Sequence, residues 1–174
     1  MGMLSVLYLV VTPEMYEKYA EAAAKYNASD YATERNSGFD LFCDSDYSVE
    51  QMKTTFIKFG VVAANAVNES KIRDSGPNSL AFWLMPRSSI SKTRLMCANS
   101  MGLVDKAYRG PLMGATKLDG SHFATVNVAA GDRLYQVVPG DAQPWWEVRI
   151  VKSVEELPWP NTERGAGGFG STGK

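Results

Sequence analysis

The sequence is poor in the residues that build metal centres and disulfide frameworks. It has two cysteines, Cys43 and Cys97, and one histidine, His122, in 174 residues. Two cysteines make neither a disulfide framework nor a zinc site, and a single histidine excludes the usual histidine-based metal cluster.

An excess of charge of one sign and a long hydrophobic run are also absent. The 18 Lys and Arg residues balance 19 Asp and Glu residues, for a net charge of −1. This balance leaves no electrostatic footprint for DNA or an anionic membrane surface. No apolar run approaches the length that spans a bilayer, and no Lys or Arg precedes the apolar segment 4–11 as in a signal peptide. We expect a soluble, intracellular protein, cytoplasmic or nuclear, with no nucleic-acid or membrane partner.

Hydrophobic residues make up 45% of the chain and charged residues 21%, which is typical of a globular protein of about one domain. The segment 4–11 is rich in Val, Leu and Tyr and predicts a strand. A helix over 13–26 is then expected, because Thr12 can cap it, Pro13 suits its first position and Glu14 suits the positive end of its dipole. Apolar residues recur at helical spacing as far as Tyr26.

After this helix the pattern changes to short apolar or alternating runs separated by turn residues. These runs cover 39–43, 54–67, 80–85, 95–98, 112–118, 122–128, 133–138 and 146–151. Gly, Pro, Asn, Asp and Ser lie between them, as in Pro139-Gly140-Asp141. Many short strands at this spacing indicate an all-β sandwich, jelly roll or barrel.

The last segment, 164–174, is rich in glycine and imitates two phosphate-binding motifs. It contains most of a G-x-x-x-x-G-K loop and a G-x-G-x-x-G pattern. Both motifs require a strand before the loop and a helix after it, and here no helix follows. The composition of this segment fits two interpretations equally well. It is typical of a flexible linker, and also of a segment that becomes ordered over a nucleotide. Arg164 and Phe169 favour the second interpretation, because a guanidinium binds phosphate and a ring stacks on a base.

Five polar blocks, in order, resemble those of the trimeric, all-β dUTPase family. The blocks are Asn36-Ser-Gly-Phe-Asp-Leu41, Pro86-Arg-Ser-Ser89, Asn99-Ser-Met-Gly-Leu-Val-Asp-Lys-Ala-Tyr-Arg-Gly110, Gly131-Asp-Arg-Leu-Tyr-Gln136 and Arg164-Gly-Ala-Gly-Gly-Phe-Gly-Ser-Thr-Gly173. Together they span most of the chain, and the third and fifth are the most specific.

The resemblance implies a fold and an activity. The fold would be a distorted jelly-roll or β-clip barrel of short strands with one N-terminal helix, assembled as a homotrimer with shared active sites. Residues 1–163 would form the β domain, and 164–174 a tail that closes over an active site. The enzyme would be a dUTP diphosphatase that uses Mg²⁺ to hydrolyse dUTP to dUMP and pyrophosphate. This reaction limits uracil in DNA and supplies dUMP for dTTP synthesis.

The third block would supply the nucleoside site. Asp105 resembles the base that deprotonates the water attacking the α-phosphate. Tyr108 would pack on the sugar and exclude a ribose hydroxyl. Asn99 and the hairpin backbone, including Gly102, would read uracil. From the residues alone, the ordinary alternatives are a turn aspartate, a core tyrosine and a turn asparagine.

The second, fourth and first blocks would supply the phosphate and metal sites. Arg87 and Gln136 correspond to catalytic residues at the phosphates, and Ser88 to a phosphate-contacting hydroxyl. Asp40 corresponds to the carboxylate that holds Mg²⁺ through water, with the triphosphate as direct ligand. A solvated turn and an edge position are the ordinary alternatives.

The tail would complete the site. Arg164 and Ser171 would bind the phosphates, Phe169 would stack on the base, and Gly170 would belong to the same substrate-binding segment. In the family this tail crosses to a site between two other subunits, so that each site uses three chains. Closure of the tail would exclude water and hold the α-phosphate in line.

Three alternatives stay open beside this interpretation. One is the dCTP deaminase-type activity on the same fold, which the intact Asp-x-x-Tyr-Arg-Gly block disfavours. Another is a nucleotide-responsive regulatory protein. Loss of Asp105 or Arg164 would favour that alternative, and both residues are present. The last is a jelly-roll structural protein, which the ordered polar blocks disfavour.

Overall fold

Strands dominate the part of the chain that the structure, a computed structural model, describes: residues 4–67, 79–120 and 125–168. The strands are β1 (Ser5–Val11), β2 (Phe39–Leu41), β3 (Tyr47–Glu50), β4 (Thr55–Val67), β5 (Ser79–Leu80), β6 (Phe82–Pro86), β7 (Leu95–Cys97), β8 (Gly102–Val104), β9 (Pro111–Leu118), β10 (Thr125–Val128), β11 (Tyr135–Pro139) and β12 (Glu147–Val151). One α-helix, α1 (Tyr16–Ala28), and the 3₁₀ helices η1 (Pro13–Met15), η3 (Ser88–Lys92) and η4 (Val154–Glu156) complete these elements.

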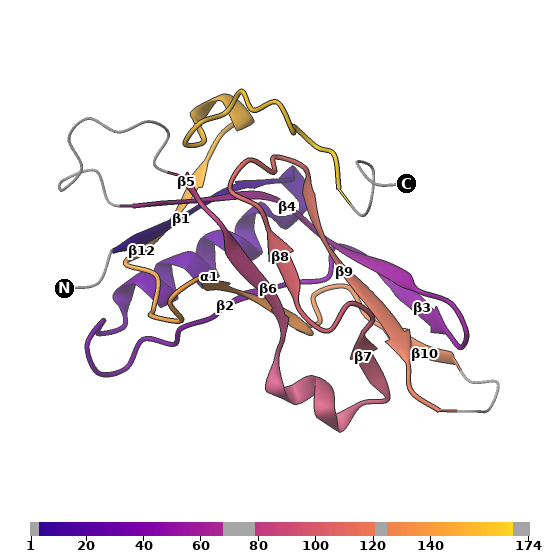
Figure 1. Cartoon of the computed structure of the whole chain (residues 1–174). Coiled ribbons are helices and arrows are strands. Elements are labelled where there is room, and N and C mark those ends of the chain that lie inside the picture. Colours follow the sequence, from indigo (N-terminus) through magenta and orange to yellow (C-terminus); the bar gives the residue numbers. More distant parts are fainter. Residues whose placement is uncertain (1–3, 68–78, 121–124, 169–174) are drawn as a thin grey trace.

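The strands form three sheets, and the all-β class is confirmed (Figure 1). The largest has the order β12-β1-β4-β9-β7, with β5 paired to β4. A second sheet has the order β2-β11-β6-β8, and β3 pairs with β10 as a separate ribbon. All pairs are antiparallel except that of β1 with β12. No sheet closes on itself within the described residues, so the expected barrel is instead a stack of open sheets.

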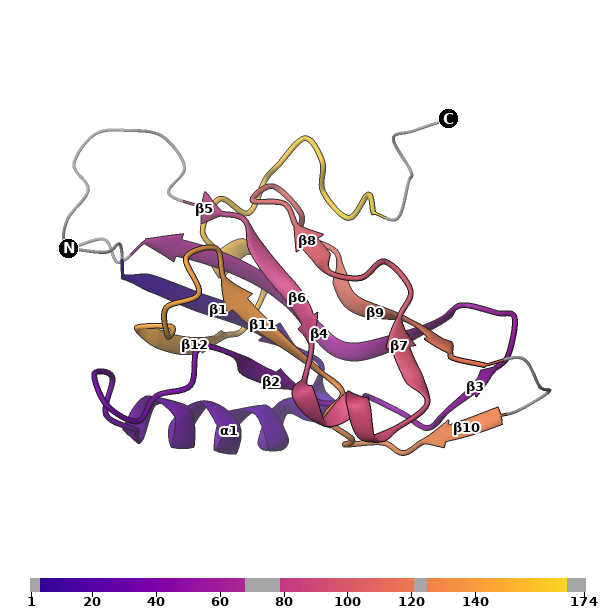
Figure 2. The same ribbon diagram turned by 60° about the horizontal axis from the view of Figure 1, so that its bottom comes forward.

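Helix α1 covers the edge of β12 and lies beside β2 (Figure 2). Asn27 acts as an extra strand residue: its Nδ2 donates to Val148 O at 2.8 Å, and Val148 N donates to its Oδ1 at 2.9 Å. The Arg35 guanidinium donates to the carbonyl oxygens of Asn27 and Ser29 at 2.7 Å, at the negative end of the helix. Strand β12 is an edge strand, and the Asn27 side chain pairs with backbone groups at its free edge that would otherwise have no strand partner.

The core lies between the sheets and the helix, and two large aromatic side chains organise it. Trp145 is fully buried, and its Nε1 donates to Val137 O at 3.1 Å. Tyr19 is also fully buried, and its hydroxyl donates to Phe59 O at 3.0 Å and accepts from Phe42 N at 3.1 Å. Burial raises the pKa of Tyr19, so the hydroxyl stays protonated as a donor. This side chain therefore joins α1 to β4 and to the end of β2.

The expected elements agree with the structure in most places. The first strand and the helix are confirmed, as are the runs around β4, β7, β9, β11 and β12, but α1 ends at Ala28 rather than at the expected Tyr26. The Thr12 side chain caps nothing, because the chain enters the helix through η1 without a side-chain cap. Strands β3 and β8 are additional, and the run 80–85 divides into β5 and β6. No helix in the described segments is long and apolar enough to cross a membrane.

Replacing Tyr19 by Phe should weaken the joint between helix and sheets. The variant leaves the buried Phe59 carbonyl and Phe42 N–H without partners, each of which costs about 1–3 kcal/mol when unpaired in the interior. We expect a loss of about 2 kcal/mol or more in the free energy of unfolding, measured in urea. Tyr16→Phe is the matched control, since Tyr16 is 53% exposed. Equal stability of the two variants would contradict the role given to the Tyr19 hydroxyl.

Candidate active site

A pocket of about 200 Å³ lies against the hairpin-like turn that connects β7 to β8. These two strands pair with β9 and β6, in different sheets, and not with each other. We call this opening the hairpin pocket. The four candidates of the third block, Asn99, Gly102, Asp105 and Tyr108, line it together with Leu103 and Val104. Arg164 from the tail lines it as well. The structure thus brings the expected base, sugar and uracil residues together around one space.

The turn of the hairpin holds the Asn99 side chain in a fixed orientation. Cys97 Sγ donates to Asn99 Oδ1 at 3.0 Å, which leaves the Nδ2 group for other partners. Ser100 has a φ of 62°, and Met101 N donates to Asn99 O at 2.7 Å. A Cβ at Gly102 would lie 3.3 Å from Leu84 O and 3.8 Å from Asn99 Nδ2, so the hairpin backbone passes close to β6 beside the amide.

Tyr108 forms a wall of the pocket. Its hydroxyl donates to Pro111 O at 2.8 Å, and its ring lies so close to Gly110 that a Cβ there would come within 2.6 Å of Cζ. Burial raises the pKa of Tyr108, and the neighbouring Arg164 acts in the opposite direction. The ring is therefore fixed at the hydroxyl end and by the glycine beneath it.

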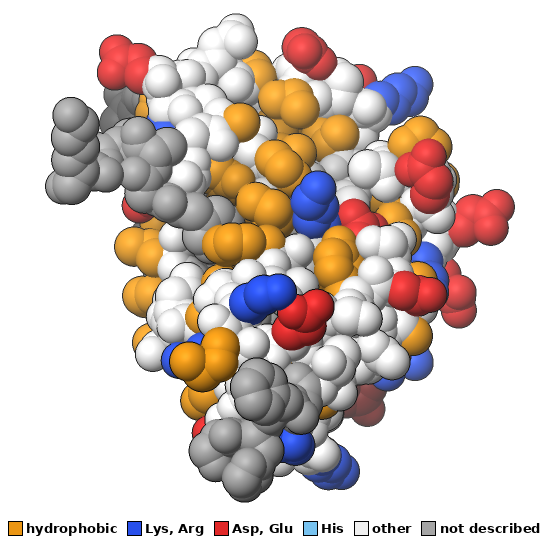
Figure 3. Space-filling model, turned by 90° about the vertical axis from the view of Figure 1, so that its right-hand side faces the viewer, with side chains coloured by type: hydrophobic (Ala, Val, Ile, Leu, Met, Phe, Trp, Pro, Cys, Tyr) orange, Lys and Arg blue, Asp and Glu red, His pale blue; other side chains and the backbone are white. Residues whose placement is uncertain are grey.

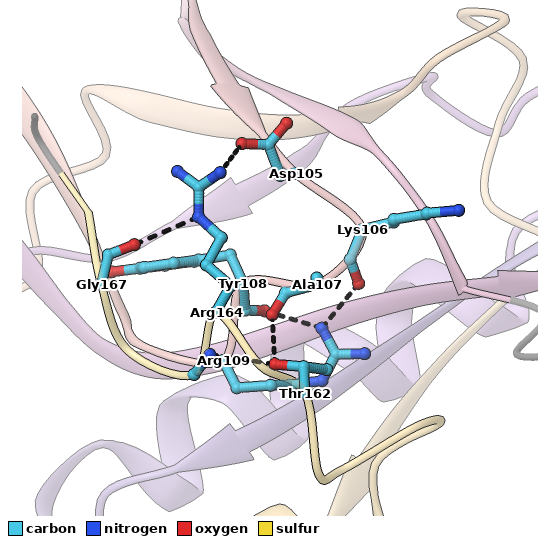
Figure 4. A network of polar contacts seen from close by, with 9 residues as sticks. Asp105, Lys106, Ala107, Tyr108, Arg109, Thr162, Arg164 and Gly167 are labelled. Atoms are coloured by element: carbon cyan, nitrogen blue, oxygen red, sulfur yellow. Dashed lines mark hydrogen bonds and ion pairs between the residues drawn. The ribbon is translucent and has the colours of Figure 1, made fainter. Parts of the chain in front are cut away.

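Residues 162–167 contact the loop 105–109, which borders this pocket (Figure 4). The Arg164 guanidinium pairs with the Asp105 carboxylate, and both side chains are partly exposed. Arg164 Nε also donates to Gly167 O at 3.1 Å, and Thr162 Oγ1 donates to Ala107 O at 2.6 Å. The expected base and the expected tail arginine are thus direct partners within one chain.

A second, larger opening of about 730 Å³ lies along β11 and α1. We call it the β11 groove. Asp40, Arg87, Ser88 and Gln136 all line it. The pairing of β2 with β11 places Asp40 directly opposite Gln136, so both side chains share one face of the sheet. The expected phosphate and metal residues are thereby brought together.

Asp40 is held between two arginines in this groove. Arg87 Nε lies 2.7 Å from Asp40 Oδ1, and Arg133 Nη1 lies 3.2 Å from Oδ2. Gln136 covers Gly38, because a Cβ on that glycine would come within 2.0 Å of Gln136 Oε1. Two guanidinium groups against one carboxylate leave the site with excess positive charge, which suits an anionic ligand.

The pocket and the groove lie on opposite faces of the β2-β11-β6-β8 sheet. Tyr135 lines the hairpin pocket and Gln136 lines the β11 groove. Successive residues of a strand point to opposite faces, so this separation follows from the strand itself. One chain therefore presents the expected site residues as two separate groups.

Some functional candidates lie outside the expected set. Cys97 and Tyr135 line the hairpin pocket, Arg133 pairs with Asp40, and Arg109 holds the tail. Arg109 and Arg133 lie within the polar blocks, but only their spatial contacts reveal what they do. The expected tail residues Phe169, Gly170 and Ser171 lie outside the described residues.

Comparisons with known proteins point to one family. A family model described as dUTPase matches residues 24–173. The deoxyuridine 5'-triphosphate nucleotidohydrolases of Coxiella burnetii (strain Dugway 5J108-111) and Haemophilus influenzae (strain PittEE) are each 33% identical over 147 residues, 83% of this chain and 85% of theirs. Among solved structures, dUTPase from Streptococcus mutans aligns with a TM-score of 0.46 at 22% identity, covering 63% of this chain and 80% of that one.

The relatives that match this all-β chain are hydrolases of a nucleotide, which defines its broad class. The family match covers most of the chain, and the bacterial relatives match over most of their own length. The chain belongs to the dUTPase family.

Gly38 tests the geometry of the β11 groove. Gly38→Ala should displace the Gln136 amide from its position over the backbone, because the new methyl group occupies its space. We expect binding of inorganic triphosphate, measured by calorimetry, to weaken by about tenfold, the loss of one hydrogen bond to a charged group. Gly140→Ala is the control, since a Cβ there would lie 3.7 Å from Ala81 O, an ordinary contact. If both variants bind triphosphate equally well, Gln136 does not contribute to binding of the anion.

Proposed function

We propose that the protein hydrolyses dUTP to dUMP and pyrophosphate, by attack of water on the α-phosphate. The observation that carries this proposal is the convergence of Asn99, Gly102, Asp105 and Tyr108 on the hairpin pocket in a chain of the dUTPase family. In the cell this reaction would limit uracil in DNA and supply dUMP for dTTP synthesis.

Asp105 acts as the general base. A carboxylate accepts a proton from water when the two are within hydrogen-bond reach, and Asp105 borders the pocket with about two-fifths of its side chain exposed (41%). A triphosphate that enters the site carries more negative charge than the Asp105 carboxylate, and so it competes with that carboxylate for the Arg164 guanidinium. The guanidinium then transfers from carboxylate to phosphate, which frees Asp105 to hold the water and also stabilises the charge that develops on the phosphates.

The hairpin reads the base. The Cys97 thiol donates a hydrogen bond to Asn99 Oδ1, so the Nδ2 group of that amide is available to donate to a uracil carbonyl. Cytosine carries an amino group where uracil has a carbonyl, and two donors facing each other are unfavourable. The backbone at Gly102, which lies beside the amide, supplies the remaining contacts.

The β11 groove binds the phosphates through Arg87, Ser88 and Gln136. Because this groove and the hairpin pocket occupy opposite faces of one sheet, a single nucleotide reaches both only if a second copy supplies the groove. A homotrimer with shared sites satisfies this requirement. The hairpin also exposes Met101 (50%) and Leu103 (55%), and hydrophobic side chains gather on one face of the chain (Figure 3), as is typical of a surface that another copy covers.

Mg²⁺ fits the groove only as an ion carried by the substrate. No group of three or more His, Cys, Asp or Glu side chains in the described segments is placed to hold a metal. Asp40 uses one lone pair of each oxygen for Arg87 and Arg133, and each oxygen has a second lone pair for a metal-bound water. When bound, Mg²⁺ would neutralise charge on the triphosphate. A solved structure of a mutant dUTPase from phage phi11 of S. aureus reveals the coordination of a structural Mg(II) ion in that protein.

The first test is pyrophosphate release from dUTP, UTP, dCTP and dTTP with Mg²⁺. We expect release from dUTP alone, and Asp105→Asn should reduce kcat by about a thousandfold or more while a non-hydrolysable dUTP analogue still binds, because general-base loss adds to the loss of charge at the water. Asp119→Asn is the matched control, an exposed aspartate outside both sites. Deamination of dCTP would assign the sister activity, and binding of dUTP without turnover would indicate a regulatory protein.

Tyr108 tests the choice of sugar. Tyr108→Ala should raise kcat/KM for UTP relative to dUTP by about tenfold or more, since steric exclusion of a hydroxyl is lost with the ring. Tyr108→Phe keeps the ring and should keep the preference for dUTP. A preference that survives in the alanine variant would place the sugar elsewhere in the pocket.

A further inference from the structure

Helix α1 forms one wall of the β11 groove. Ala22, Lys25, Tyr26 and, at the end of the helix, Ser29 line the groove. Their spacing of three and four residues places them on one face of the helix. The family match begins at residue 24, so most of this helix lies outside it. The groove is therefore built from the polar blocks together with side chains that α1 adds.

Hydrogen bonds fix this wall beside the first polar block. The Tyr26 hydroxyl donates to Asn36 O at 2.6 Å and accepts from Trp145 N at 3.0 Å. Burial raises the pKa of Tyr26 to about 12, so the hydroxyl remains a donor. Because Asn36 begins the block that carries Asp40, α1 is held next to the residues expected to bind phosphate and metal.

Lys25 is the charged residue of this wall. Its side chain is exposed, and it forms no ion pair with any residue that the structure describes. The other two cations of the groove, Arg87 and Arg133, are both engaged with Asp40. Glu34 is the second carboxylate of the lining, so three cations face two carboxylates. The ammonium group of Lys25 is thus available to an anion in a groove of net positive charge.

A second lysine of α1 lies near the groove, two helical turns before Lys25. Lys18 Nζ lies 5.7 Å from the centre of the Phe42 ring, a cation–π contact, and Phe42 lines the groove. Lys18 also occupies the space beside Gly131, at the start of the fourth block. The helix therefore adds positive charge at two points along the same side of the groove.

We infer that Lys25 binds the β,γ-diphosphate part of the substrate, the part that leaves as pyrophosphate, and that α1 thereby extends the phosphate site. The inference rests on the proposed function, in which the α-phosphate lies at Asp105 in the hairpin pocket and the rest of the triphosphate enters the groove. A lysine ammonium is a point charge on a flexible stem, which suits the mobile end of a phosphate chain. It also stabilises the negative charge that develops on the leaving pyrophosphate.

Equilibrium binding to the Lys25→Gln variant tests the inference. Calorimetry at low salt measures Kd for a non-hydrolysable dUTP analogue, for inorganic pyrophosphate and for dUMP. We expect Kd for the first two to rise about tenfold, the loss of one hydrogen bond between charged groups. Kd for dUMP should stay at the wild-type value, because dUMP lacks the β- and γ-phosphates. The loss should shrink at high salt, and Lys25→Arg should recover most of the affinity.

Two controls separate a contact from a general effect of charge. Ala24→Glu changes the net charge by the same amount one residue away, at an exposed position that does not line the groove. Lys152→Gln repeats the substitution at an exposed lysine outside both sites. Both variants should bind all three ligands as the wild type does. A loss in Ala24→Glu equal to that in Lys25→Gln would reduce the effect to long-range electrostatics and overturn the inference.

The remaining outcomes also decide the question. A lysine in the last turn of a helix stabilises that helix through its dipole, and a role confined to this would lower the free energy of unfolding in urea with all three affinities unchanged. An equal loss for dUMP would place Lys25 at the α-phosphate instead. Wild-type protein that binds the analogue and pyrophosphate but leaves dUTP intact refutes the proposed hydrolysis, and the same affinities still decide the role of Lys25. Wild-type protein that binds neither ligand overturns both.

Discussion

Successive side chains of strand β11 point to opposite faces of its sheet, and this alternation determines on which face each candidate site residue lies. Tyr135 closes the floor of the hairpin pocket, where its hydroxyl and that of Thr116 lie 2.8 Å apart. Gln136, the next residue, lies opposite Asp40 in the groove on the other face. A two-residue period cannot turn both side chains to the same ligand. The separation of the residues proposed to bind the nucleoside from those proposed to bind the phosphates is thus a property of the sheet, and the proposed sharing of sites between copies would follow from it.

The buried Arg109 has a comparable influence on the loop that follows the hairpin. Burial lowers the pKa of its guanidinium, and the carbonyl groups around it offset the cost of removing the charge from water. Four of those carbonyls come from two segments about fifty residues apart in sequence. One buried side chain therefore joins residues 158–159 to the loop that carries Asp105 and Tyr108.

The sequence predicted those elements whose signal is local. Strand β1, helix α1 and strand β4 have long periodic patterns, and their existence and type are confirmed. Strand β8 has three residues, one of them glycine, which is too short for a pattern. The open sheets and the division of the site into two groups depend on strand register, which pairs Asp40 with Gln136 across ninety-six positions. The roles of Cys97 and Arg109 depend on contacts that no spacing encodes.

The N-terminal elements, which precede most of the family match, have a structural connection to the site. The match begins at residue 24, so β1 and the first part of α1 lie outside it. Strand β1 pairs in parallel with β12, and Asn27 of α1 closes the other edge of β12 at Val148. Strand β12 leads through η4 and the buried Leu157 to Pro158, the first carbonyl that Arg109 holds. Because β12 is hydrogen-bonded on both edges, the position from which the chain turns toward Pro158 and the loop 105–109 is set by the large sheet and by α1.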